Sequence, residues 1–230
     1  MDILCLIPAR GGSKGIPRKN LRSVGGRPLI TWTIEQALAA EADLHVVVST
    51  DDEEIAQVAR EAGADVPWLR PAELAVDTAA TEPTVEHAIA QVTEAGRAPD
   101  AVLLLQATSP IRLPGTLDRA VAQFTDSRVD SLVGVIPKSP FYWWASDPPR
   151  ADYDVDHRPR RQELTPPQMR YYENGSLYLT RTAIYRTHHN RIGGRVGLFV
   201  MSDVEGIDVD TYADLRLADS YLSHPEWITA

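Results

Sequence analysis

The sequence predicts an α/β protein in which helices cover both faces of a mostly parallel, twisted sheet. Short apolar runs, several of them rich in β-branched residues, alternate with longer segments of helical period, and this alternation is typical of such a sheet. The 230 residues are 43% hydrophobic and 24% charged, an ordinary composition for a folded domain that excludes a disordered or collagen-like chain. The length is compatible with one large α/β domain.

Six runs are predicted to be strands because they are short, largely apolar and bounded by turn or polar residues. In chain order they are residues 3–7, 44–49, 101–105, 131–136, 176–179 and 196–201. Four segments between them carry apolar residues at spacings of three and four, as covering helices do: residues 29–39, 53–61, 82–94 and 116–124. The acidic run 51–54 lies at the expected N-terminus of the second helix, where the helix dipole favours negative charge.

Residues 137–170 interrupt this alternation. The stretch 137–167 holds seven of the chain's 17 prolines, a density that argues against a regular helix or a central strand. A connection of about thirty residues is far longer than usual in a compact domain, and the aromatic cluster FYWW at 141–144 favours docking over disorder. We therefore expect a single domain over residues 1–230, with 137–170 as an insertion that docks on another surface.

The charge and cysteine counts narrow the class of function. The chain has 23 Lys and Arg against 32 Asp and Glu, a formal net charge of −9, which argues against nucleic-acid binding. No apolar run approaches the ~18–20 residues that span a membrane, and the first residues lack a basic stretch before their apolar run, so we expect a cytoplasmic location. The single cysteine, Cys5, supplies neither an internal disulfide nor a thiolate metal site.

The stretch IPARGGSKGIPRKN, residues 7–20, directly follows the first predicted strand and is read as a phosphate-binding loop. Three glycines allow the backbone to turn sharply and present N–H groups to an anion: Gly11, Gly12 and Gly15. Four cations lie in the same stretch: Arg10, Lys14, Arg18 and Lys19. The spacing fits neither the Walker A nor the GxGxxG pattern. A surface loop with solvated basic side chains is the alternative, but ligands of α/β sheets gather at the carboxyl ends of strands.

A second candidate centre is the sequence DVD at residues 208–210. In an extended stretch, Asp208 and Asp210 lie on the same side, so both carboxylates can converge on one hard cation. Two carboxylates together with phosphate oxygens and waters satisfy Mg²⁺. The alternative is an acidic pair in a turn. Three neighbouring acids are expected to be solvated charges: Asp203, Glu205 and Asp214.

Seven blocks of the chain resemble, in order, the acylneuraminate cytidylyltransferases, or CMP-sialic acid synthetases. They are IPARGGSKGIPRKN from residue 7, STDDEEIAQVAREAGA from 49, LRPAELAVDTAAT from 69, LLLQATSPIR from 103, RPRRQ from 158, YYENGSLYL from 171 and IDVDTYADLRLAD from 207. The resemblance implies a Rossmann-like nucleotidyltransferase fold that uses Mg²⁺ to join CTP to a nine-carbon 2-keto acid sugar, giving a CMP-sugar and pyrophosphate. It also implies a homodimer in which the insertion reaches the partner's sugar site.

The same resemblance assigns roles to individual residues. For the nucleotide it implies Arg10, Gly11, Lys14, Lys19, Asn20, Arg70, Asp77, Thr78 and Thr81. For the sugar it implies Gln106, Arg160, Arg161, Gln162, Arg170, Tyr172 and Asn174. Lys19, Asp208 and Asp210 are the expected catalytic residues, with the two aspartates holding the metal. The implied reaction is in-line attack of the sugar's anomeric hydroxyl on the α-phosphorus, without a covalent enzyme intermediate.

One departure leaves the sugar open. Many bacterial members of this family carry an arginine in a pattern like FRPNG, where this chain has Tyr172 in YYENG. Neuraminate, its deaminated analogue, legionaminate and pseudaminate are therefore all possible sugars. A Kdo-type cytidylyltransferase or another sugar-nucleotide pyrophosphorylase is a rival within the enzymes. A metal-dependent glycosyltransferase that uses DVD, or a non-catalytic sugar-nucleotide sensor, is a rival of another class.

Overall fold

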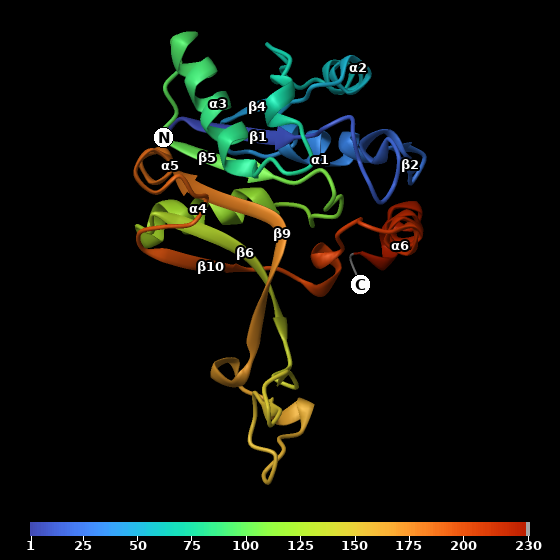
Figure 1. Cartoon of the computed structure of the whole chain (residues 1–230), viewed down its shortest axis with the longest axis vertical. Helices are drawn as coiled ribbons and strands as arrows, with labels where there is room; N and C mark the ends of the chain where they lie inside the picture. Colours follow the sequence, from blue (N-terminus) through green and yellow to red (C-terminus); the bar gives the residue numbers. More distant parts are fainter. Residues whose placement is uncertain (229–230) are drawn as a thin grey trace.

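The computed structural model describes residues 1–228, which form a six-stranded sheet in the order β10-β6-β9-β5-β1-β4 (Figure 1). The strands are β1 (Ile3–Pro8), β4 (Leu44–Ser49), β5 (Ala101–Leu105), β6 (Ser131–Lys138), β9 (Arg170–Arg181) and β10 (Val196–Val200). All six predicted strands are present. Strand β9 is antiparallel to both of its neighbours, whereas the other pairings in this sheet are parallel, so the prediction of a mostly parallel sheet is confirmed.

Helices cover both faces of this sheet. One face packs against α1 (Leu29–Leu38), α2 (Glu53–Glu61) and α4 (Thr116–Ser127), and the other against α3 (Thr81–Glu94) and α5 (Thr182–His188). The four predicted helices are confirmed within a few residues at each end, whereas α5 was not predicted. No helix within residues 1–228 combines the length and the apolar character that crossing a membrane requires.

A third apolar cluster lies beside the sheet and joins the two sequence motifs. Helix α6 (Tyr212–Ser223) packs there against the small hairpin of β2 (Ser23–Val24) and β3 (Arg27–Pro28). The cluster includes Ile16 from the basic loop and Val209 from between the two aspartates, both fully buried. Hydrophobic packing therefore fixes the DVD stretch next to the basic loop. Four 3₁₀ turns complete the body: η1 (Lys19–Leu21), η2 (Ala72–Leu74), η5 (Asp203–Gly206) and η6 (Pro225–Trp227).

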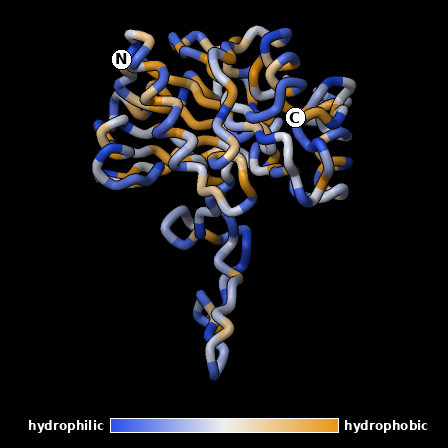
Figure 2. The backbone as a smooth tube through the Cα atoms, turned by 45° about the horizontal axis from the view of Figure 1, so that its top comes forward, coloured by the Kyte–Doolittle hydropathy of each residue, from blue (hydrophilic) through white to orange (hydrophobic). Residues whose placement is uncertain are grey.

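Strands β6 and β9 continue beyond the sheet as a two-stranded arm that protrudes from the body (Figures 1 and 2). The arm ends in β7 (Trp143–Trp144), β8 (Arg150–Ala151), η3 (Arg161–Glu163) and η4 (Pro166–Gln168). Figure 2 shows that most residues of the arm are hydrophilic or neutral, whereas those at the centre of the body are hydrophobic. Pro137 nevertheless lies within β6, because β10 pairs with β6 only as far as Val135 and leaves an unpaired edge beyond it.

Where the arm begins, β9 departs from regular pairing with β6. Val133 pairs with Tyr178 but Val135 pairs with Glu173, so extra residues of β9 bulge out between these pairs. Gly175 lies in this bulge with a φ of +73°, and a Cβ there would come within 3.0 Å of Oε1 of Gln106. The bulge therefore brings β9 against the end of β5 and requires glycine at its closest approach.

Candidate active site

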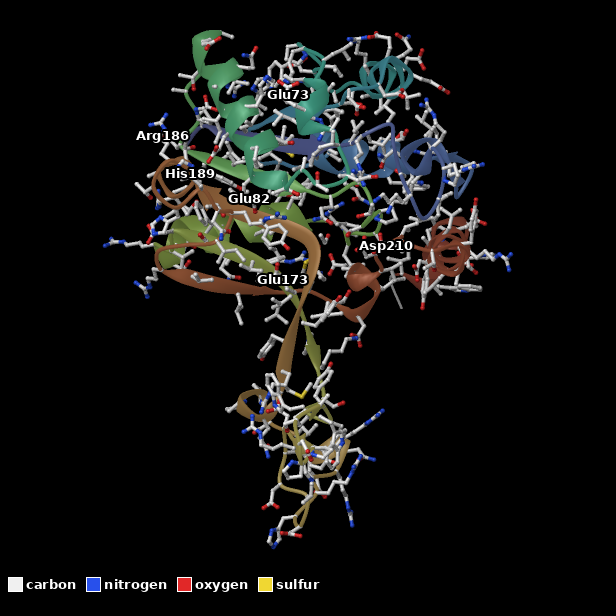
Figure 3. The ribbon with its side chains drawn as sticks, in the orientation of Figure 1. Glu73, Glu82, Glu173, Arg186, His189 and Asp210 are labelled. Atoms are coloured by element: carbon white, nitrogen blue, oxygen red, sulfur yellow. The ribbon has the colours of Figure 1, made fainter. Side chains whose placement is uncertain are left out.

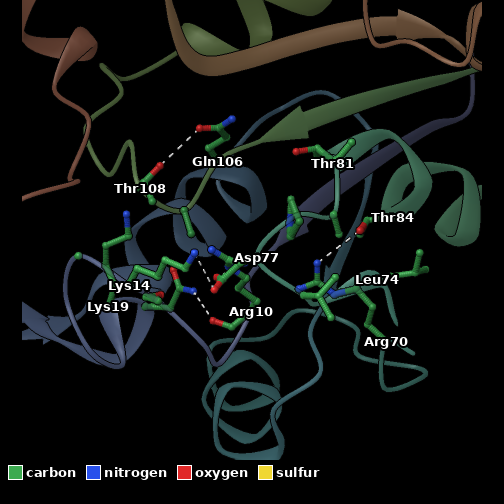
Figure 4. A pocket seen from close by; sticks show the side chains of 18 of the residues that line it. Arg10, Lys14, Lys19, Arg70, Leu74, Asp77, Thr81, Thr84, Gln106 and Thr108 are labelled. Carbon is green, nitrogen blue, oxygen red and sulfur yellow. Dashed lines mark hydrogen bonds and ion pairs between the residues drawn. The ribbon is translucent and has the colours of Figure 1, made fainter. Parts of the chain in front are cut away.

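A cavity of about 460 Å³ opens at the carboxyl ends of β1 and β5 (Figure 4). Its walls come from the basic loop, from the segment between η2 and α3, from the residues that follow β5 and from the DVD stretch. The side chains used below that line it are Arg10, Lys14, Lys19, Asn20, Arg70, Asp77, Thr81, Thr84, Gln106, Thr108 and Asp210. Ligands of α/β proteins bind at this edge of the sheet, as the sequence indicated for the basic loop.

Three of the four loop cations lie in the cavity. Arg10 and Lys14 both pair with Asp77, and Lys19 donates to the carbonyl of Val209 at 2.6 Å and pairs with Asp210 at 3.0 Å. Arg18 instead adopts a left-handed backbone conformation and pairs with acids at the start of α2. The loop thus directs three positive charges inward, which suits a polyanion such as a phosphate chain.

Two glycines of the loop, Gly11 and Gly15, lie where the backbone passes close to neighbouring residues. The N–H of Gly11 donates to Oδ1 of Asp51 at 3.0 Å, so its contact with a bound phosphate stays a prediction. A Cβ at Gly11 would lie 2.6 Å from a carboxylate oxygen of Asp52, and one at Gly15 would lie 2.7 Å from the backbone oxygen of Asp210. Glycine is therefore required where the loop touches α2 and the DVD stretch.

Some, but not all, of the residues expected to bind the nucleotide lie in the cavity. Arg70 is 8% exposed, and its guanidinium donates to the carbonyl of Ser49 at 3.1 Å and to Thr84 at 3.4 Å (Figure 4). Burial lowers the pKa of Arg70, although nearby Asp51 opposes this shift. Asn20 is buried and donates to the carbonyl of Arg10 at 3.1 Å. Thr81 lines the cavity, whereas neither Thr78 nor Gly11 does.

Gln106 follows β5 and is held in place by a residue that the sequence reasoning missed. Arg112 is buried, and its guanidinium donates to the carbonyls of Gln106 at 3.2 Å and Ser176 at 2.7 Å. Burial lowers the pKa of Arg112 to about 10. Arg112 thereby ties the end of β5 to the bulge of β9. Its one sequence signal is its place at the end of the block LLLQATSPIR.

The other residues expected to bind the sugar do not line this cavity. Asn174 is buried, where its amide donates to Sδ of Met201 at 3.2 Å and accepts from the backbone of Ser176 at 3.1 Å. Tyr172 lies near the root of the arm, which Glu173 marks in Figure 3. The remaining four are further along the arm: Arg160, Arg161, Gln162 and Arg170. Within one chain, Gln106 is therefore the expected sugar ligand that the cavity contains.

The two aspartates have different surroundings, because Asp210 lines the cavity and Asp208 does not. Asp208 is partly buried, and its Oδ1 has no hydrogen-bond partner among residues 1–228. Burial raises the pKa of Asp208, and the negative charge of Asp210 adds to this rise. Asp210 lies exposed at the cavity (Figure 3). The described residues contain no cluster of three metal ligands, but two carboxylates with one free buried oxygen suit Mg²⁺ when a substrate phosphate supplies further oxygens.

One acid near this pair contradicts the sequence expectation. Glu205 was expected to be a solvated charge, but it is 2% exposed. Its carboxylate accepts from the backbone N–H of Leu113 at 2.9 Å, from Thr116 at 2.6 Å and from the backbone of Ser202 at 3.0 Å. The buried carboxylate thereby fixes the turn from Leu113 to Thr116 that leads into α4.

Comparisons of the sequence with known proteins match it to cytidylyltransferases. The cytidylyltransferase family model matches residues 4–208. A CMP-N,N'-diacetyllegionaminic acid synthase from Legionella pneumophila is 36% identical over 96% of this chain and 97% of its own. A pseudaminic acid cytidylyltransferase from Campylobacter jejuni is 32% identical over 95% of each chain. An N-acylneuraminate cytidylyltransferase B from Danio rerio is 33% identical over 93% of this chain and 50% of its own.

Solved structures support the same fold. A CMP:2-keto-3-deoxy-manno-octonic acid synthetase in complex with CTP superposes with a TM-score of 0.72, over 98% of this chain and all of its own, at 16% sequence identity. A 4-diphosphocytidyl-2C-methyl-D-erythritol synthase from Anaerococcus prevotii gives a TM-score of 0.67. The Rossmann-like nucleotidyltransferase fold implied by the sequence is thus confirmed. With a family model matching most of its length and relatives above 30% identity across it, the chain belongs to the cytidylyltransferase family and is a nucleotidyltransferase.

Proposed function

We propose that the protein joins CTP to a nine-carbon 2-keto acid sugar and releases pyrophosphate. The observation that carries this proposal is that one cavity gathers Arg10, Lys14 and Lys19, with Gln106 and Asp210 beside them. Three cations suit a triphosphate, and a neutral amide suits a polyhydroxylated sugar because it both donates and accepts. The relatives reported above are named for legionaminic, pseudaminic and N-acylneuraminic acids, which supports this class of sugar.

In the proposed reaction the anomeric hydroxyl oxygen attacks the α-phosphorus of CTP in line with the leaving pyrophosphate. The protein's part is to align the two substrates and to offset negative charge, for which no covalent intermediate is needed. Lys19 is held by the carbonyl of Val209 and by Asp210, so its ammonium is fixed at the cavity wall before substrate arrives. Arg10 and Lys14 would bind the outer phosphates, and Gln106 would orient the sugar.

Asp208 and Asp210 would hold the Mg²⁺ that this reaction requires. When bound, the cation neutralises charge on the phosphate oxygens and so favours attack on the α-phosphorus. The rigid backbone between the aspartates suits this role, because Val209 is fully buried and its N–H donates to the carbonyl of Thr108 at 2.8 Å. The pair is therefore fixed relative to both the basic loop and the end of β5.

The arm would complete the sugar site of a second copy in a homodimer. Trp143 and Trp144 are 58% and 56% exposed, and apolar side chains so exposed mark an interaction surface. Arg160 has an 80% exposed side chain, and a guanidinium of this kind can clamp the sugar's carboxylate through paired hydrogen bonds. A cytoplasmic location is part of the same proposal, because nucleoside triphosphates are made there.

The test is pyrophosphate release in the presence of Mg²⁺. CTP, UTP, ATP and GTP would each be combined with N-acetylneuraminate, its deaminated analogue, legionaminate, pseudaminate and Kdo. Release with CTP and at least one of the four nonulosonates is the expected result. Release with Kdo alone would move the protein to the Kdo-type enzymes. Binding of CTP without turnover on any acidic sugar would instead support a non-catalytic role.

A further inference from the structure

Asp77 occupies the position that a phosphate group would be expected to take between two cations of the cavity. Its Oδ1 lies 2.9 Å from Nη1 of Arg10, and its Oδ2 lies 3.0 Å from Nζ of Lys14 (Figure 4). One carboxylate therefore bridges two cations that come from a different wall of the cavity. A phosphate group makes the same kind of charge-assisted contacts.

The ion pairs of Asp77 with Arg10 and Lys14 are exposed enough to break and re-form. Asp77 lies in the short connection between η2 and α3, and its side chain is 41% exposed. Lys14 is 75% exposed and forms no other ion pair within residues 1–228. Lys19 differs, because it is only 13% exposed and is anchored by Val209 and Asp210. Lys14 thus depends on Asp77 for its place in the cavity, whereas Lys19 does not.

We propose that Asp77 is a displaceable counter-ion that sets the selectivity of the cavity for phosphate chains. It holds Arg10 and Lys14 while no phosphate is bound, gives them up to an incoming polyphosphate, and pairs with them again when pyrophosphate leaves. The identity of that polyphosphate as CTP rests on the function proposed above. The sequence resemblance instead placed Asp77 in a turn near the cytidine.

The energetics allow such an exchange. Exposed ion pairs are individually weak, so a multiply charged phosphate chain can displace a single carboxylate. The hydrogen bond from Lys14 holds the pKa of Asp77 below its usual range, so the carboxylate is ionised at neutral pH and competes as an anion. A ligand that needs both cations binds only while the bridge is open. Its apparent affinity is therefore its affinity for the open form multiplied by the fraction of molecules in which the bridge is open. A ligand that touches neither cation is unaffected.

Calorimetric titration of the full-length chain tests this exchange through the variant Asp77→Asn, which keeps the shape of the side chain and removes its charge. Wild type and variant would each be titrated with inorganic pyrophosphate, CTP and cytidine. Pyrophosphate and CTP should bind the variant about two- to tenfold more tightly, as expected for the loss of two exposed ion pairs, while cytidine binding stays unchanged. Glu73→Gln is the matched control, because Glu73 carries the same charge in η2 but does not line the cavity.

Each other outcome has a distinct meaning. Weaker binding of both CTP and cytidine by Asp77→Asn would show that Asp77 contacts the nucleoside, and would overturn the proposal. Unchanged pyrophosphate affinity would also overturn it, as would an equal gain in Glu73→Gln, which would point to overall charge. If wild type binds pyrophosphate but not CTP, the proposed function fails, while tighter pyrophosphate binding by the variant would still support the counter-ion role.

Discussion

Asp208 and Asp210 are two residues apart, yet the fold gives them different surroundings. Asp208 is partly buried with an unpartnered oxygen, whereas Asp210 is exposed and paired with Lys19. Val209 between them is fully buried, which fixes the backbone and directs the two neighbours. An unpartnered buried carboxylate oxygen costs free energy unless a ligand satisfies it, and this is the main structural reason to place a cation here.

Replacing Asp208 with Ala should lower kcat by about 100-fold or more, because the metal that we propose for this site would supply several kcal/mol of charge stabilisation. The fold should survive, because the pKa of Asp208 is raised by burial and removing the carboxylate relieves this cost, although Thr108 loses a hydrogen bond. The measurement is steady-state turnover at saturating Mg²⁺, with thermal unfolding as the check on folding. Asp203→Ala is the control, because Asp203 is exposed and pairs with Lys138 outside the cavity. Wild-type turnover in Asp208→Ala would remove this residue from the metal site.

Much of the candidate site could be predicted at the level of single residues, but their partners could not. The basic loop and the DVD pair are recognisable because their residue types and spacing match phosphate and metal chemistry. The burial of Glu205 and the bond from Gly11 to Asp51 depend on segments that lie about 90 and 40 residues away in the chain. No local pattern carries such information, so the expectation of a solvated Glu205 was wrong and the bond from Gly11 to Asp51 was not predicted.

At the scale of elements, the set of bonds from Glu205 to the turn that leads into α4 is the contact most open to a stability test. Glu205→Gln should destabilise the protein by about 1–3 kcal/mol, because the buried carboxylate receives several hydrogen bonds that a neutral amide satisfies less well. Urea unfolding at neutral pH measures this difference. Asp203→Asn, on the same 3₁₀ turn but exposed, should change stability by less than about 0.5 kcal/mol. Equal effects of the two variants would contradict this role of Glu205.

The start of α2 gives a prediction about pH. Partial burial raises the pKa of Asp52, but hydrogen bonds from Arg18 and from the backbone N–H groups of Ile55 and Glu54 outweigh burial, and the pKa lies below its usual value of 3.8. A carboxyl group whose pKa falls on folding stabilises the protein fully above the unfolded-state pKa, and this stabilisation is lost as the pH falls through the folded-state pKa.

Asp52→Asn keeps a good helix cap but removes the charge. Near pH 7 we therefore expect the variant to be less stable than wild type by about 1 kcal/mol or less, because the ion pairs with Arg18 are partly exposed. The difference should shrink toward zero as the pH falls below about 4. Urea unfolding of both proteins at pH 7 and at pH 3 measures it. A gap that widens in acid would contradict the role assigned to Asp52.

Helices and strands were predicted well where apolar residues recur at a regular spacing. They were predicted less well where contacts with distant segments determine the structure. All six strands were found, but β9 is longer than predicted because its first residues pair with β6 in the arm, where polar and aromatic residues give no strand period. Helix α6 buries only Ala218 and Leu222, so its apolar stripe is thin. The sequence analysis did not predict α6. The one pattern that indicates its start is the capping box that Thr211 forms with Asp214.

At the scale of the whole molecule, the arm is large for a feature that only connects two strands. It carries exposed aromatic residues at its tip, and the expected sugar ligands of residues 160–172 lie on it, away from the cavity of the same chain. A second copy that received this arm would bury the aromatic surface and bring cations to its own sugar site. The long proline-rich insertion indicated such an excursion, but not its extended shape.

Light scattering after size-exclusion chromatography should therefore show a dimer at micromolar concentration. The double variant Trp143→Ser and Trp144→Ser should weaken dimerisation by tenfold or more, since aromatic anchors contribute about 2 kcal/mol or more each at interfaces. Turnover per chain should fall with the dimer fraction. Leu38→Ser, which alters a similarly exposed apolar residue on the body, is the control. A wild-type protein that stays monomeric yet fully active would refute the shared site.

The most direct test of the whole account is the identity of the product. Mass spectrometry of a reaction with CTP, Mg²⁺ and the best nonulosonate should detect a CMP-sugar in a one-to-one ratio with pyrophosphate. The CMP-sugar should be absent when the sugar is left out. Pyrophosphate formed together with free CMP, and no CMP-sugar, would mean that the cavity hydrolyses CTP rather than transferring its cytidylyl group to a sugar.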